Sequence, residues 1–270
     1  MKKYIFLLLA AAFLFDACDE IPPVAKGSSG TRTVLIEEFT GVRCVQCPAG
    51  SVAIQDLLAI HGDRLVAVSI HAGDFSPPYP NSQYDFRTEE GSQLINYLDV
   101  PFGYPSASID RKLFPGQFDL QLGQGDWAGF ISSELAIEPK LRINVEPSFD
   151  AGTRELKATV KLLVDETIPD ADVRLSLMIT ESEIHDLQIT PGSATPIPDY
   201  THRHVLRGMM TNWDGDPIGE PLTQGAVVEK SFTFTMPEEW KEEHCEIVAF
   251  VSLAGSSKEV LQAQQVPVIE

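Results

Sequence analysis

The chain has 270 residues and a mass of 29.7 kDa, a size that suits two modest domains, each able to bury a hydrophobic core. Apolar residues make up 43% of the sequence, which excludes a disordered chain despite 19 prolines and 19 glycines. The formal net charge of −19 repels nucleic acid and anionic lipid, so we expect neither as a partner.

The N-terminus predicts an export signal rather than a folded element. Two lysines precede an apolar run at 4–15, which is too short to cross a bilayer comfortably and suits the core of a signal peptide. The Ala-Cys pair that ends at Cys18 resembles a bacterial lipoprotein processing site, in which Cys18 would become the acylated N-terminus. We therefore expect residues 1–18 to be signal peptide and anchor, and residues 19–30, rich in Pro, Gly and Ser, to be a tether.

Cys44 and Cys47 form a CxxC motif between an apolar strand predicted at 33–39 and a helix predicted at 49–61. Two cysteines three apart on a first helical turn lie on one face, with Cβ atoms roughly 5–6 Å apart. A disulfide needs Cα atoms about 4.4–6.8 Å apart, so this pair can open and close with little backbone movement. A structural staple gains most by closing a long loop, so the spacing favours a redox dithiol.

The remaining cysteine, Cys245, lies in a strand-like run and is expected to be a small buried hydrophobic residue. An exported chain meets an oxidising compartment, where a close pair rests as a disulfide unless a reductant is supplied. A permanent structural disulfide is one alternative for the pair, and half of a zinc site is a second. The zinc site would need two more ligands, for which only His71, His244 and Cys245 are candidates, without a second CxxC spacing.

Strand and helix patterns alternate up to residue 138. The run at 65–71 predicts a second buried strand, parallel to the first through a right-handed crossover. An aromatic and proline-rich segment at 72–86 predicts a long loop, which either packs on the domain or forms a binding lip beside the CxxC. The later elements are a helix at 88–98, a proline-marked turn into a third strand at 100–110, and a helix at 126–137.

Beyond residue 138 the hydrophobic pattern changes to period two. About six or seven antiparallel strands with no good helix predict an all-β sandwich of immunoglobulin-like architecture at 139–270. Residues 185–199 contain three prolines and predict a long loop. The alternating runs lie at 141–145, 156–164, 173–179, 228–234, 247–253 and 260–268.

The order strand, CxxC, helix, strand, helix, proline turn, strand and helix resembles an α/β thioredoxin-like domain over residues 31–138. The Gly-Tyr-Pro-Ser stretch implies that Pro105 is the family's cis-proline, which faces the dithiol and, with Tyr104, helps hold substrate. Glu38, six residues before Cys44, falls where that family places a buried acid beneath the second cysteine. An ordinary trans proline and simple packing of the tyrosine are the alternatives.

A longer phrase, Val-Leu-Ile-Glu-Glu-Phe-Thr-Gly at 34–41 followed by Cys-x-x-Cys-Pro-Ala-Gly, resembles the Omp28-related outer-membrane lipoproteins of Bacteroidetes. This resemblance covers nearly the whole length. It implies an exported thioredoxin-like domain joined to a β-rich C-terminal domain, located in the cell envelope at the outer membrane and facing the periplasm or the surface. It indicates location and fold more than activity.

In the redox interpretation, Cys44 is the exposed nucleophile and Cys47 the buried resolving thiol. An ordinary thiol with a pKa near 8.5 is only about 3% thiolate at pH 7, so we expect the helix N-terminus and Arg43 to lower the pKa of Cys44. Glu38 is expected to be protonated part of the time and to take the Cys47 proton. Strand alternation places Glu37 on the opposite face, as a solvated carboxylate.

The other candidate sites favour ordinary structural interpretations. His202 and His204 share a strand face, but no carboxylate or third histidine stands nearby in sequence, so surface histidines are expected. The Asp-Gly sequence within 212–216 predicts a turn rather than a calcium loop, because Pro217 and Thr223 fall where an EF-hand needs Gly and Glu. The sequence contains no phosphate-binding loop, HExxH or GxSxG motif.

Two functions remain open from the sequence. The first is an exported thiol-disulfide oxidoreductase, without a cofactor, whose partners are protein thiols or disulfides of the envelope. The second is a non-catalytic surface lipoprotein, an adhesin or binding module with a permanent disulfide at 44–47. In both, the chain meets the membrane only through its N-terminal lipid.

Overall fold

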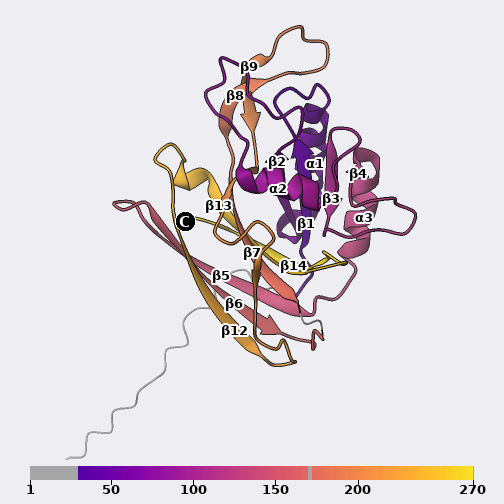
Figure 1. The fold of residues 1–270 in the computed structure, drawn as a ribbon, viewed down its shortest axis with the longest axis vertical. Coiled ribbons are helices and arrows are strands. Elements are labelled where there is room, and N and C mark those ends of the chain that lie inside the picture. Colours follow the sequence, from indigo (N-terminus) through magenta and orange to yellow (C-terminus); the bar gives the residue numbers. More distant parts are fainter. Residues whose placement is uncertain (1–29, 170–171, 270) are drawn as a thin grey trace, which may run out of the picture.

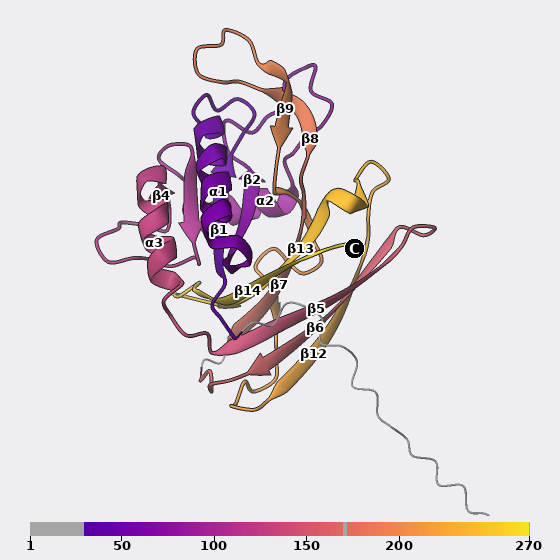
Figure 2. The ribbon, with the colours of Figure 1, turned by 180° about the vertical axis from the view of Figure 1, so that it is seen from behind.

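The computed structural model describes residues 30–169 and 172–269, so the predicted signal peptide and the Cys18 lipid site lie outside the described residues. Within this part, helices surround one end of a mixed sheet, and a second, smaller sheet lies at the other end (Figures 1 and 2). No described helix is both long and apolar enough to cross a membrane. The helices are α1 (Cys47–His61), α2 (Glu89–Tyr97) and α3 (Trp127–Glu134), with short 3-10 turns η1 (Gly62–Arg64), η2 (Gln124–Asp126) and η3 (Glu242–His244).

The main sheet has the strand order β14-β13-β7-β10-β2-β1-β3-β4, and β11 pairs with β7 beside this path. It therefore takes strands from both halves of the chain. Its strands are β1 (Val34–Thr40), β2 (Leu65–His71), β3 (Ser106–Ile109), β4 (Leu122–Gly123), β7 (Val173–Glu181), β10 (Val205–Met209), β11 (Asp216–Pro217), β13 (Cys245–Leu253) and β14 (Val260–Pro267).

The centre of this sheet agrees with the sequence pattern. β1 pairs with β2 in parallel, as the crossover through α1 requires, and β3 pairs with β1 in antiparallel. Every residue of β1 and β2 is buried, which explains why most of their side chains are apolar on both faces of the sheet. Side chains of α1 and α3 pack against one face of these strands, while α2 packs on the other.

The helix and strand ends differ from the predicted ones by a few residues. Helix α2 begins at Glu89 because the Thr88 hydroxyl caps it, accepting a hydrogen bond of 2.9 Å from the Gly91 N–H. Strand β3 begins only at Ser106, after the proline-marked turn that was expected to lead into it. The two-residue strand β4 follows the loop beyond β3, where no strand was predicted.

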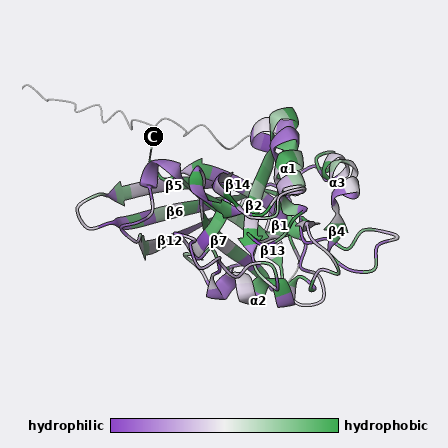
Figure 3. Ribbon diagram, turned by 90° about the horizontal axis from the view of Figure 1, so that it is seen from above, coloured by the Kyte–Doolittle hydropathy of each residue, from purple (hydrophilic) through white to green (hydrophobic). Residues whose placement is uncertain are grey.

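A three-stranded antiparallel sheet covers one face of β7 and β13. Its strand order is β12-β6-β5, and a large apolar core fills the space between it and the main sheet. Burial alternates along its strands, and Figure 3 shows the corresponding green and purple residues. The three strands of this smaller sheet are β5 (Leu141–Asp150), β6 (Glu155–Val164) and β12 (Val227–Thr235). The other three predicted period-two runs are β7, β13 and β14 of the main sheet, so all six are confirmed as strands.

The two halves of the chain are joined through this main sheet. Val205 of β10 pairs in parallel with Ser69 of β2, so the sheet runs across residue 138 without interruption. The buried Arg32 side chain also connects the two halves, because it donates to the Asp110 carboxylate at 2.6 Å and to the Val260 carbonyl at 2.7 Å. The C-terminal half is thus a mostly β region that shares its sheet with the first half. Its immunoglobulin-like topology and the boundary at residue 138 stay predictions.

The loop predicted at 185–199 is wrong, because this segment contains a β-hairpin. Its strands are β8 (Ile184–Gln188) and β9 (Ile197–His202). The inward residues of β8 are Ile184, Asp186 and Gln188, so two of the three buried positions are polar and no apolar alternation marks the strand. The hairpin lies beside β2 and the start of α1, at the end opposite the three-stranded sheet (Figures 1 and 2).

The aromatic loop at 72–86 packs under this hairpin. The buried Asp186 carboxylate accepts hydrogen bonds from the backbone N–H groups of Gln83 and Tyr84, at 3.1 and 2.9 Å. Phe86 is buried in a small apolar cluster with Ile184 of the hairpin. Loop packing, one of the two expected roles of this segment, is therefore what the structure shows.

Candidate functional site

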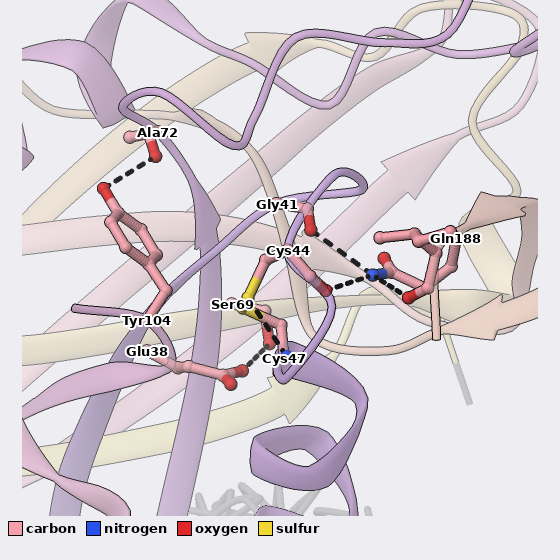
Figure 4. The surroundings of a disulfide bond; sticks show 9 residues. Glu38, Gly41, Cys44, Cys47, Ser69, Ala72, Tyr104 and Gln188 are labelled. Atoms are coloured by element: carbon pink, nitrogen blue, oxygen red, sulfur yellow. Dashed lines mark hydrogen bonds between the residues drawn. A yellow bond between two sulfur atoms is a disulfide. The ribbon is translucent and has the colours of Figure 1, made fainter. Parts of the chain in front are cut away.

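Cys44 and Cys47 form a disulfide at the start of α1 (Figure 4). Their Cα atoms are 5.4 Å apart, within the range expected from the spacing. The Cys47 backbone N–H donates a hydrogen bond of 3.0 Å to the Cys44 sulfur. The first residue of the helix thus already directs a backbone dipole at Cys44, the arrangement that stabilises a thiolate.

The expectation that Cys44 is exposed is wrong in this state of the protein. Cys44 and Cys47 are each only 3% exposed. The cover comes partly from Gln188 of the hairpin, whose amide donates to the carbonyls of Cys44 at 3.1 Å and Gly41 at 3.4 Å. The N–H of Ile189 also donates to the Val42 carbonyl, at 3.0 Å. A segment from the C-terminal half therefore closes over the CxxC turn, which the sequence alone did not indicate.

Glu38 lies beneath the disulfide, on the β1 face that carries the CxxC helix (Figure 4). It is 1% exposed, and burial is the main cause that raises its pKa from 4.5 to about 8. The Ser69 hydroxyl donates to Oε2 at 3.3 Å, while Oε1 has no partner among the described residues. At neutral pH most of the carboxyl population is therefore protonated, in line with its expected acid-base role.

Gly50 of α1 allows the helix to approach this carboxyl. A Cβ atom at Gly50 would lie 2.5 Å from Glu38 Oε1 and 2.7 Å from Pro105 Cβ, so any larger residue would push the helix away. The same contacts show that Glu38 and Pro105 lie together under the first turns of α1. The glycine thus determines how closely helix, acid and proline meet.

The Tyr104–Pro105 peptide bond is cis, as the resemblance implied. The Tyr104 hydroxyl donates to the Ala72 carbonyl at 3.2 Å, and burial raises the pKa of this phenol to about 12. Its ring packs edge-on against Phe75, with centroids 5.2 Å apart. A groove of about 360 Å³ lies beside Pro105 and is lined by residues 102–106 together with Gln121 and Gly123.

 

Arg43 holds the aromatic loop. Its side chain donates to the carbonyls of Pro77 at 2.7 Å and Pro78 at 2.6 Å, and its guanidinium lies 4.7 Å from the centre of the Tyr79 ring. These contacts fix the loop beside the CxxC turn. The expected influence of Arg43 on the pKa of Cys44 stays a prediction.

Two histidines line the same small cavity as Glu38, and neither was predicted to belong to this site. His71 at the end of β2 and His202 at the end of β9 are each 4% exposed, so the expectation of a surface histidine at 202 is wrong. Burial lowers the pKa of His202 to about 4 and also lowers that of His71. Their rings lie 5.7 Å apart, centre to centre. His71 follows Ser69 by two residues on β2, which is the signal that could have placed it near Glu38.

His204 lies just beyond β9 and takes no part in this group. It is half-buried, burial lowers its pKa to about 4, and its Nε2 lies 3.2 Å from the Gln55 amide of α1. The expectation of a surface residue is therefore wrong here as well. The hairpin fold, which turns this segment towards α1 and β2, buries both histidines.

The remaining candidates have structural surroundings. Cys245 is a free cysteine, buried in the core between the two sheets, as expected, and burial raises the pKa of its thiol. Asn212 and Asp216 close a turn through a hydrogen bond of 2.7 Å, with Gly215 at a φ of 83°. Across residues 30–169 and 172–269, no three His, Cys, Asp or Glu side chains are grouped so that they could hold a metal ion.

Comparison with solved structures shows the fold. HBP35 of Porphyromonas gingivalis is similar, with a TM-score of 0.71 and 17% identity over 89% of this chain and 76% of that one. A protein of Agrobacterium tumefaciens is similar with a TM-score of 0.54 and 12% identity, covering 89% and 96% of the two chains. A domain of the outer membrane lipoprotein Omp28 from P. gingivalis matches 48% of this chain and 88% of its own, with 20% identity and a TM-score of 0.32.

No curated protein shows significant sequence similarity to the chain. The family model described as outer membrane protein Omp28 matches residues 91–270, which is two thirds of the 270 residues. The expected location in the cell envelope, at the outer membrane, is thereby confirmed. The chain belongs to the Omp28 family of outer membrane proteins.

Proposed function

We propose that this protein is a thiol-disulfide oxidoreductase of the envelope, built on a thioredoxin-like region at 31–138 and an immunoglobulin-like β region at 139–270. The parallel β1–α1–β2 unit, the antiparallel β3 and the cis peptide before Pro105 support the first assignment. The two packed β layers of the C-terminal half support the second. Protein thiols and disulfides of the envelope are the proposed partners.

The observation that carries the redox proposal is the Glu38 carboxyl, buried beneath Cys47 without a cationic partner among the described residues. A buried carboxyl without a cationic partner destabilises the fold when it ionises, and a permanent disulfide has no use for one. Thiol chemistry does use it, because a leaving thiolate needs a proton at the moment the disulfide breaks. A pKa of about 8 matches this task near neutral pH.

A substrate with two thiols would be oxidised in two steps. A substrate thiolate attacks the Cys44 sulfur, the Cys44–Cys47 bond breaks, and the Cys47 thiolate takes the Glu38 proton. The second substrate thiolate then attacks its partner sulfur in the mixed disulfide and releases Cys44 as a thiolate, which accepts the Cys47 N–H hydrogen bond. The substrate loses two electrons and the CxxC pair gains them. The reverse sequence reduces a substrate disulfide.

The exposed apolar side chains around the Pro105 groove support peptide binding on that side. Phe102, which lines the groove, is 100% exposed, and Phe75, which packs against Tyr104, is 42% exposed. The hairpin covers the CxxC turn from its own side through Gln188. An incoming polypeptide would approach along the groove. Contact with the buried Cys44 sulfur then requires the CxxC turn or the hairpin to move.

A second function is favoured by the burial of both cysteines and by the hairpin that covers them. In this alternative, the disulfide only stabilises the fold, and the protein is a non-catalytic surface lipoprotein that binds an envelope or host protein. Closing so short a loop contributes little through chain entropy, so such a disulfide would act mainly by holding the turn.

A comparison of cysteine variants of the mature chain separates the two functions. We expect the wild type to exchange disulfides with a small model disulfide and with a reduced model protein. Cys44→Ser should abolish exchange, Cys47→Ser should trap a mixed disulfide visible by mass spectrometry, and Cys245→Ser should behave as the wild type. If the wild type and Cys44→Ser are equally inert and mild reductant leaves the pair closed, the second function holds.

The anchor is proposed to be a lipid on Cys18, followed by the tether at 19–30. The Ala-Cys processing site and the location of the family at the outer membrane support it. Labelling with a radioactive fatty acid tests it. The wild type should carry label and sediment with membranes, whereas a Cys18→Ser chain that keeps both properties would exclude this anchor.

A further inference from the structure

A water-sized cavity lies between the disulfide and the β8–β9 hairpin. Its volume is about 20 Å³, enough for one water molecule. Glu38 and Cys47 line it from the N-terminal half, with His71 at the end of β2. His202 lines it from β9, so the C-terminal half completes its wall.

Three side chains that line this cavity each have a buried polar atom without a partner among the described residues. These atoms are Glu38 Oε1, His71 Nδ1 and His202 Nε2. The three side chains are 1%, 4% and 4% exposed. Buried polar groups are almost always satisfied, and an internal water typically makes about three hydrogen bonds.

The placement follows from strand periodicity. Glu38 and Ser69 are register partners of the parallel β1–β2 pair, and His71 is two residues beyond Ser69 on the same face. The hairpin then brings His202 against His71, with Phe86 packed against both rings at 4.9 and 4.7 Å. The aromatic packing holds the two imidazoles in place beside the cavity.

We propose that Glu38, His71 and His202 share one buried water and form a proton relay that serves the Cys47 sulfur. The relay rests on the proposed redox function and adds the two histidines to it. When the disulfide opens, Glu38 gives its proton to the Cys47 thiolate and is reprotonated through the water. When the pair closes, Glu38 takes the Cys47 proton and the same path removes it.

Both histidines act in their neutral form. Burial lowers the pKa of each, so at neutral pH each ring has one nitrogen that donates and one that accepts, as a relay requires. The half-buried Ser51, Tyr200 and Arg203 form the outer wall, through which protons exchange with solvent. The other charged or titratable groups that act on the two rings are Asp85, His185, Asp186 and Arg207.

The test uses His71→Gln, His202→Gln and the double variant, with His204→Gln as matched control. His204 is half-buried and also has a lowered pKa, but it contacts Gln55 and does not line the cavity. We expect the double variant to slow exchange with a small disulfide about tenfold at pH 7 and to change the shape of the pH-rate profile. His204→Gln should leave rate and profile unchanged. Equal profiles in the wild type and the double variant would overturn the relay.

A second readout is independent of exchange activity. Infrared difference spectra recorded on chemical reduction should show the Glu38 carboxyl band, identified by its loss in Glu38→Gln. The band should shift in His71→Gln and His202→Gln but not in His204→Gln. If the wild type fails to exchange and the band still shifts, the redox proposal fails while the shared water stands. An identical band in all histidine variants overturns the shared water, whatever the activity.

If a histidine variant fails to fold, the relay can still be tested by NMR of the wild-type protein. Ring ¹⁵N chemical shifts of His71 and His202 should change when the disulfide is reduced, because the proton and hydrogen bonding of Glu38 change. Those of His204 should stay the same. Unchanged shifts at His71 and His202 would contradict the relay.

Discussion

The neighbouring carboxylates Glu37 and Glu38 lie on opposite faces of β1 and have different hydrogen-bond partners. Glu37 and Glu38 are 0% and 1% exposed, so burial does not distinguish them. Glu37 accepts two hydrogen bonds from the Arg111 guanidinium, at 2.7 and 2.6 Å, and that guanidinium lies 4.6 Å from the centre of the Phe250 ring. Glu38 receives one long hydrogen bond from a neutral hydroxyl.

The difference in partners between Glu37 and Glu38 indicates a different role for each face of β1. Glu37 was expected to be solvated, and the structure corrects this: it is the anion of a buried pair that joins β1 to the segment after β3. A carboxylate paired in this way joins two parts of the structure. An unpaired one has a raised pKa and can exchange its proton, which is the property that thiol chemistry needs.

The largest expected effect on stability comes from breaking the buried ion pair between Glu37 and Arg111. Arg111→Met leaves Glu37 as an uncompensated buried charge and should lower the free energy of unfolding by about 3–5 kcal/mol. Urea denaturation at pH 7 measures it. Arg87→Met, which breaks the exposed pair with Asp85, should cost less than about 1 kcal/mol. Equal losses of unfolding free energy in the two variants would show that the buried pair stabilises the fold no more than the exposed one.

Adding Glu37→Leu to Arg111→Met should restore much of the loss, since it removes the unpaired charge. A double variant that is as unstable as the two single variants combined would contradict the pairing argument.

Glu38→Gln should raise the free energy of unfolding at neutral pH, whereas Arg111→Met should lower it. Below its ordinary pKa of 4.5 the carboxyl is protonated in both states, so the stability it contributes is fully present. Between pH 4.5 and about 8 only the unfolded state releases the proton, so wild-type stability falls as pH rises. The variant lacks this fall and should be more stable than wild type by about 3 kcal/mol at pH 7.

Denaturation of the oxidised protein from pH 5 to pH 9 checks the Glu38 prediction. Glu155→Gln, at an exposed position of β6, is the control and should follow the wild-type curve. A constant difference between Glu38→Gln and wild type across this range would show that Glu38 has an ordinary pKa.

The smallest effect is expected for Ser69→Ala. The Ser69 hydroxyl stabilises the ionised carboxylate, so its loss should move the Glu38 titration to higher pH. Stability at pH 5, where the carboxyl is neutral in the fold, should change by less than about 1 kcal/mol. The carboxyl infrared band, followed against pH, measures the shift. A shift to lower pH would mean that another donor controls Glu38.

Much of the site was predictable because its signals are local. The apolar runs of β1 and β2, the CxxC spacing and the helix after it depend on residues close together in sequence. The position of Glu38 and the cis peptide before Pro105 came from resemblance, and both are found where it implied. The exposure of Cys44 was predicted wrongly because its cover comes from Gln188, 144 residues later.

The strand-turn-helix unit that carries the two cysteines and the period-two strands of the second half could be predicted from the sequence. Which polar groups lie together is visible only in the folded chain. Glu37 finds Arg111 74 residues away, and His71 meets His202 through a hairpin whose inward residues are largely polar. Local patterns reflect burial of each element's own side chains, whereas the charge state of a buried group depends on partners that only the folded chain brings within reach.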